Sequence, residues 1–101
     1  MIVQGSNEPL YIEFIDVNDL PADDISISLR NEIEELKHWG KEDVTKDELT
    51  YTAPISQEES IDWPVGPCVI EIKYLDNFGN IIHLREKTKI IPWGDKTILG
   101  D

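Results

Sequence analysis

The stretch SQEESIDWPVGPCVIEIKYLDNFGN, residues 56–80, decides the fold because it joins a helical turn to a long strand. Ser56 stands three residues before Glu59, the spacing of a capping box in which each side chain accepts a hydrogen bond from the other residue's backbone N–H. Pro64 and Gly66 follow and prevent a longer helix. We therefore expect one short helical turn and then a corner at which the chain crosses from one sheet to another.

After this corner, apolar and polar residues alternate as in a half-buried strand. The positions expected to face the core are Cys68, Ile70, Ile72 and Tyr74. A turn follows over residues 76–80, where Gly79 can adopt the positive φ that hairpin loops often need. The returning strand is expected from Ile81 to Leu84 and, after a break, to the end of a hairpin formed by residues 67–91.

Three earlier segments alternate in the same way: PLYIEFI at 9–15, DISISLR at 24–30 and ELTYTAPIS at 48–56. Residues 33–39 have helix-forming residues, but the segment is short and Gly40 follows it directly. We interpret it as a strand that returns through a turn, with a helix as the open alternative. The sequence thus predicts an all-β protein, an antiparallel sandwich of six or seven strands with one short helical turn.

The length of 101 residues fits one domain, which we place at residues 1–93, followed by a C-terminal tail at 94–101. The single cysteine, Cys68, excludes an internal disulfide and lies in an apolar alternation, where a thiol behaves as a small core hydrophobe. The tail region contains three apolar residues able to pack on a neighbouring molecule. These candidate interface residues are Trp93, Ile98 and Leu99.

The composition has 21 acidic and 9 basic residues and a net charge of −12, which repels nucleic acids and anionic membranes. The N-terminus lacks the basic start and unbroken apolar run of a signal peptide, and no segment approaches the ~20 apolar residues of a membrane span. We expect synthesis in the cytoplasm, with neither nucleic acid nor membrane as partner.

The sequence contains no recognisable catalytic pattern. His38 and His83 are the two histidines, and neither lies in a recognisable motif. The glycines are scattered, so no phosphate-binding loop is formed. We therefore predict no catalytic residue, no cofactor, no metal site and no enzymatic activity.

Two binding alternatives stay open. An oxygen-rich loop could hold calcium, although its spacing does not match an EF-hand; its residues are Asp16, Asn18, Asp19, Asp23 and Asp24. Asp76 and Asn77 form a smaller candidate of the same kind. Tryptophan faces could stack on sugars, but Trp39 and Trp63 are expected in the core and Trp93 is expected to be the most exposed.

The segments ISISLRN, ELKHW, ISQEESIDWPVGPCVIEIKYLDNFGNII and KIIPW together resemble short proteins encoded by phages and prophages of Gram-positive bacteria. The resemblance covers roughly residues 8–93 and extends to the N-terminal domain of phage baseplate upper proteins. It implies an immunoglobulin-like sandwich that acts as a non-enzymatic structural or accessory component of a virion. Its implied partners are other phage structural proteins and further copies of the chain. The alternative is a carbohydrate- or calcium-binding sandwich module.

Overall fold

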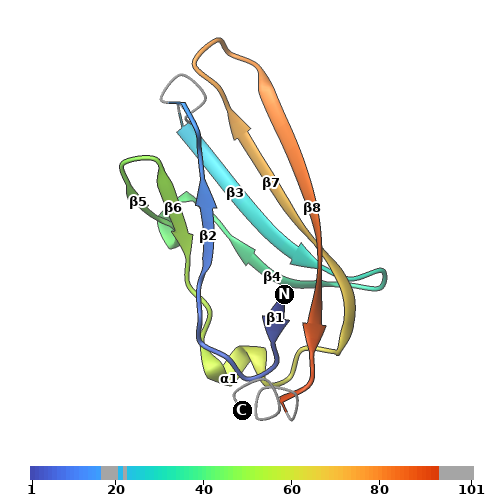
Figure 1. The fold of residues 1–101 in the computed structure, drawn as a ribbon. Helices are drawn as coiled ribbons and strands as arrows, with labels where there is room; N and C mark the ends of the chain where they lie inside the picture. Colours follow the sequence, from blue (N-terminus) through green and yellow to red (C-terminus); the bar gives the residue numbers. More distant parts are fainter. Residues whose placement is uncertain (17–20, 22, 94–101) are drawn as a thin grey trace.

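The computed structural model describes residues 1–16, 21 and 23–93, and these form two β-sheets (Figure 1). The larger sheet has the strand order β1-β8-β7-β3-β4, and the smaller sheet has the order β2-β6-β5. The elements are β1 (Ile2–Val3), β2 (Leu10–Glu13), β3 (Asp23–Arg30), β4 (Glu35–Trp39), the 3-10 turn η2 (Lys41–Asp43), β5 (Thr45–Asp47), β6 (Thr50–Ala53), α1 (Gln57–Ser60), β7 (Gly66–Leu75) and β8 (Ile81–Ile91).

The all-β, sandwich-like architecture is confirmed, with two corrections to the expected topology. The larger sheet is mixed, because β1 runs parallel to β8 and pairs Ile2 with Ile90. Within the described residues there are eight strands, where six or seven were expected. The additional short strands are β1, with two residues, and β5, whose residues are all exposed. Strand β1 is too short, and β5 too short and too polar, to produce an alternating pattern.

The predicted corner at residues 56–66 is confirmed: the chain leaves β6 of the smaller sheet, forms α1 and enters β7 of the larger sheet. The capping box is present, because the Glu59 backbone N–H donates to Ser56 Oγ at 3.2 Å and the Ser56 N–H donates to Glu59 Oε1 at 2.9 Å. The Ser60 hydroxyl is fully buried and donates to the Ser6 carbonyl at 2.7 Å. This bond ties α1 to the N-terminal segment.

The segment at residues 33–39, for which a helix stayed open, contains strand β4, which pairs with β3 through a turn. The Asn31 side chain accepts hydrogen bonds from the backbone N–H groups of Ile33 and Glu34, both at 2.8 Å, which stabilises this turn. Strand pairing places Trp39 opposite Ile27 in the core, where both are fully buried. Burial of the large indole therefore outweighs the helix propensity of the neighbouring residues.

Strand β8 is continuous from residue 81 to 91, so the expected break after Leu84 is wrong. The polar residues Arg85, Glu86, Lys87 and Thr88 all pair with β7. An alternating apolar pattern is absent there because most of these side chains are exposed on both faces of the sheet. Ladder hydrogen bonds alone maintain the strand in this region.

The core lies between the sheets. Phe14 makes edge contacts with Tyr51 of the smaller sheet and Tyr74 of the larger sheet, with ring centroids 5.6 and 5.5 Å apart. The Trp39 indole N–H donates to the Pro54 carbonyl at 2.7 Å, which connects β4 with the end of β6. Trp39 and Trp63 are buried, as predicted, and the predicted inward positions Cys68, Ile72 and Tyr74 are buried too.

Candidate protein-interaction surface

On its outer side strand β8 is bordered only by the two-residue strand β1, so most of this edge has no partner among the described strands. In the described part of the chain, its outer side pairs only with β1, at Ile90 and Ile91. Residues 81–89 therefore have a β7 partner on one side and no described strand on the other (Figure 1).

The direction of the β8 backbone groups follows from the hairpin turn. The Asp76 N–H donates to the Asn80 carbonyl at 2.9 Å, so these two residues form a hydrogen-bonded pair. Antiparallel pairs alternate between hydrogen-bonded and non-hydrogen-bonded, and the register continues from Leu75 opposite Ile81 to Gly66 opposite Ile90. The residues whose N–H and C=O groups point away from β7 are therefore Ile81, His83, Arg85, Lys87 and Lys89; the first four lie clear of the pairing with β1, which begins at Ile90.

Two further observations agree with this assignment. Pro67, which has no N–H to donate, lies opposite Lys89 at a position that makes no ladder bond to β8. At the end of the strand, the Ile91 carbonyl points outward and accepts the Gln4 N–H at 2.9 Å. The open edge thus ends where the N-terminal segment begins to cover it.

The face of the larger sheet that is turned away from the smaller sheet is rich in positive charge. Cross-strand pairing places Arg30, Val69 and Lys87 in one row, and Ser28, Glu71 and Arg85 in the next. Five of the nine lysine and arginine residues of the chain occupy this surface, which we call the basic face. They are Arg30, Lys73, Arg85, Lys87 and Lys89.

Glu71 lies at the centre of the basic face with its side chain 20% exposed. Its carboxylate is 3.7 Å from Arg30 Nε, 4.0 Å from Arg85 Nε and 3.1 Å from His83 Nε2. One carboxylate is therefore shared by two guanidinium groups and an imidazole. Each guanidinium group offers five N–H donors, so a single carboxylate does not satisfy both.

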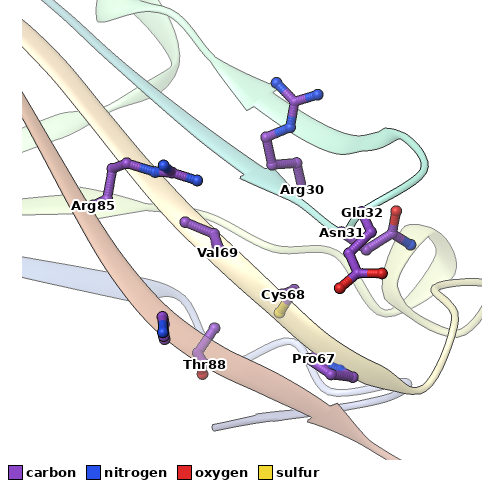
Figure 2. Close-up of a pocket in the computed structure, with 9 residues that line it drawn as sticks. Arg30, Asn31, Glu32, Pro67, Cys68, Val69, Arg85 and Thr88 are labelled. Carbon is purple, nitrogen blue, oxygen red and sulfur yellow. The ribbon is translucent and has the colours of Figure 1, made fainter.

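A hollow of about 340 Å³ lies beside these residues, between the end of β3 and the β7–β8 pair (Figure 2). Arg30, Arg85 and Lys87 contribute its cationic side chains, and Val69 and Pro67 contribute apolar surface. A second hollow of about 550 Å³ shares Pro67, Lys87 and Thr88 with the first and extends to Pro92. Both hollows therefore flank the C-terminal half of β8.

The opposite end of the hairpin is apolar. Leu75 and Ile81 lie opposite each other on the outer face, and Phe78 in the turn is 80% exposed. The Asp76 carboxylate accepts the backbone N–H groups of Phe78 and Asn80 at 2.9 and 2.8 Å. These bonds, with that of Asn80 the strongest influence, lower the pKa of Asp76. The carboxylate is therefore engaged in holding the turn.

Of the predicted interface residues, Trp93 is described and Ile98 and Leu99 lie outside the described residues, as does the predicted tail at 94–101. Trp93 is 42% exposed and is the most exposed of the three tryptophans, as expected. Its ring packs closely over Gly5, since a Cβ atom at Gly5 would lie only 2.6 Å from Trp93 Cε3 and 2.7 Å from the Ile61 side chain. Part of the ring is therefore used within the chain.

The other candidate groups are dispersed. His38 lies at the surface beside Glu35, with 3.3 Å between Nδ1 and the carboxylate, and His83 is bound to Glu71. Cys68 is buried, and burial raises the pKa of its thiol, which disfavours the reactive thiolate. Trp39 and Trp63 are in the core and cannot stack on a sugar.

Among the described residues no group of three or more His, Cys, Asp or Glu side chains is arranged to hold a metal. For the loop considered for calcium, Asn18 and Asp19 lie outside the described residues. Within the same ranges, no helix is long and apolar enough to cross a membrane. A scan against family models, a search of curated proteins and a search of solved structures each found no match.

The basic face and the open edge are features that the sequence interpretation missed, although a signal exists. In HLREKTK, residues 83–89, a histidine, an arginine and two lysines occupy every second position. In a strand this spacing places them on one face. The net charge of −12 describes the whole chain and does not indicate this local row of basic residues.

Proposed function

We propose that this chain is a non-enzymatic interaction module of the immunoglobulin-like type, which works as a structural or accessory component of a phage or prophage particle. The open edge of β8 is the observation that carries this proposal. The phage assignment rests on the resemblance of residues 8–93 to small phage-encoded sandwich proteins, and on the all-β, two-sheet architecture that such a module requires.

An open edge of this kind supports binding by strand addition, in which an extended segment of a partner pairs with the edge of a sheet. Outward N–H and C=O groups at four alternating residues of β8 are available for such pairing. Proteins that avoid edge pairing use short or covered edge strands. Strand β8 has eleven residues, and within the described chain only two of them pair with β1.

The C-terminal residues form the second contact in this proposal. Trp93 exposes 42% of its surface beside the corner formed by Gly5 and Ile61. We propose that the exposed part of Trp93, together with Ile98 and Leu99, packs against another copy of the chain. Truncation after Pro92 should then lower the oligomeric mass in sedimentation, and an unchanged mass would remove these three residues from the interface.

The test of function is mass spectrometry of particles purified from the induced source strain. The chain should occur at a fixed copy number relative to the major capsid protein. Complementation with Lys87→Pro should abolish incorporation, because proline removes an outward N–H and its ring obstructs an added strand. Lys87→Arg is the matched control, since it keeps both the N–H and the positive charge. Absence of the wild-type chain from intact particles would overturn the virion role.

A further inference from the structure

The charge of this protein is distributed very unevenly. Sixteen of the 21 acidic residues precede Trp63, whereas five of the nine basic residues lie on the basic face. A concentration of positive charge on one sheet face of an acidic protein favours a negatively charged binding partner at that face. Because this face lies beside the open β8 edge, the positions of its charges indicate where a binding partner would carry negative charge.

The same residues of β8 carry both features. His83, Arg85 and Lys87 point their backbone groups to the open edge and their side chains to the basic face. In an added antiparallel strand, residues opposite these three would form hydrogen-bonded pairs with Cα atoms about 5.5 Å apart and side chains on the same face. Alternate residues of the occupant would therefore meet the cations directly.

The cations have capacity for such partners. In the part of the chain that the structure describes, Lys73, Lys87 and Lys89 form no ion pair. Arg30 and Arg85 share Glu71 at distances of 3.7 and 4.0 Å, longer than those of strong charge-assisted hydrogen bonds. Additional carboxylates on this face would gain hydrogen bonds without displacing an optimised contact.

We propose, on the basis of the function proposed above, that the β8 edge binds an extended segment of another protein with aspartate or glutamate at every second position. A second copy of this chain does not fit the edge, because none of its described strands has two acidic residues spaced two apart. Single-stranded nucleic acid fits less well, because the described part of this face has no Phe, Tyr or Trp on which bases could stack, and the His83 imidazole is held by Glu71 at 3.1 Å.

The direct test uses two synthetic eleven-residue peptides, one alternating glutamate with threonine or valine and one with glutamine in place of each glutamate. Binding to the full chain would be followed by fluorescence anisotropy and by amide shifts of β8. The acidic peptide should bind roughly tenfold more tightly, from about three opposed charge pairs. Its affinity should fall as salt is raised from low to high concentration.

Variants locate the site. Arg85→Gln combined with Lys87→Gln and Lys89→Gln should remove the preference for the acidic peptide, whereas Lys46→Gln on the exposed strand β5 should not. Equal affinity for both peptides, or no binding of the acidic peptide at about 1 mM, would overturn the proposal. Tighter binding of single-stranded DNA, abolished by the same triple variant, would also overturn it and identify a different occupant.

The particle experiment separates this inference from the function on which it rests. If Lys87→Pro abolishes incorporation and the triple glutamine variant does not, strand addition holds and the acidic character of the occupant is wrong. If both variants abolish incorporation and Lys46→Gln does not, both proposals are supported. If the wild-type chain is incorporated and neither variant changes incorporation, the virion role stands, but the β8 edge is not the binding site and this inference fails.

Discussion

Strands β4 and β8, on opposite sides of the larger sheet, differ in the contacts that they make within the chain. At the β4 edge, the strand has five residues and two of its side chains make contacts beyond the sheet: Trp39 with the Pro54 carbonyl, and Lys37 with Glu59 of α1 at 2.8 Å. On β8, residues 81–89 pair with β7 and have no described strand on their outer side. Side chains of β4 thus tie the larger sheet to α1 and to the end of β6, whereas residues 81–89 of β8 present outward backbone groups that no described strand uses.

Removal of the buried indole at the end of β4 should produce the largest effect. Trp39→Ala empties a fully buried site and leaves the Pro54 carbonyl without its donor, so we expect a loss of about 3–5 kcal/mol in the free energy of unfolding. Urea denaturation followed by circular dichroism would measure it. Trp93→Ala, at a half-exposed ring, is the control and should cost less. Equal losses for the two variants would contradict the distinct role of β4 in joining the two sheets.

Proline substitutions on β8 test which of its backbone groups face β7 and which face outward. Thr88 forms a hydrogen-bonded pair with Cys68, so Thr88→Pro should break the ladder and cost roughly 2–3 kcal/mol of stability. Lys87→Pro removes an N–H that points to the open edge and should cost less than about 1 kcal/mol. Thermal unfolding of both variants gives the comparison. A larger loss for Lys87→Pro would reverse the assigned directions and require the edge residues to be reassigned.

The smallest expected effect concerns Glu59, which accepts the Ser56 N–H and pairs with Lys37. Burial is the largest single influence and raises its pKa, but the hydrogen bonds from Lys37 and Ser56 together outweigh it, so the pKa is lowered. The stability due to this shift is present above the unfolded-state pKa and is lost as the pH falls through the folded-state pKa.

Glu59→Gln should therefore reduce stability by about 0.5–1 kcal/mol at pH 7, with a smaller reduction at pH 3. Denaturation at both pH values would measure the difference. In a Lys37→Gln background the same substitution should cost less at pH 7, because the ion-pair partner is gone. A cost that does not change with pH would show that the pair contributes nothing at this corner.

Local patterns predicted most of the large elements. Alternation located β2, β3, β6 and β7, and the spacing of Ser56 and Glu59 predicted α1 with its cap. The patterns failed where burial is incomplete. Strand β5 is exposed along its length, and the middle of β8 is polar on both faces. Such strands form because a neighbouring strand supplies hydrogen bonds. Backbone hydrogen bonds do not require alternating apolar residues, so the sequence shows no periodic pattern there.

The candidate surface was less predictable than the fold. The predicted interface residues were chosen for their apolar character: Trp93, Ile98 and Leu99. Of these, Trp93 packs over Gly5, so only part of its ring is exposed. The stripe at residues 83–89 can be read from the sequence once a continuous strand is assumed. The sequence interpretation instead expected a break after Leu84, which is wrong, so the stripe was not recognised.

The sequence by itself determined the all-β class, the helical corner and the inward positions of β7, because these depend on residue period and on contacts between near neighbours in the chain. Only the tertiary structure decided that β8 is an edge, that β1 covers its last two residues and that Arg30 joins Lys87 across Val69. The physical reason is that strand order and register depend on pairing between residues far apart in sequence, which no local pattern records.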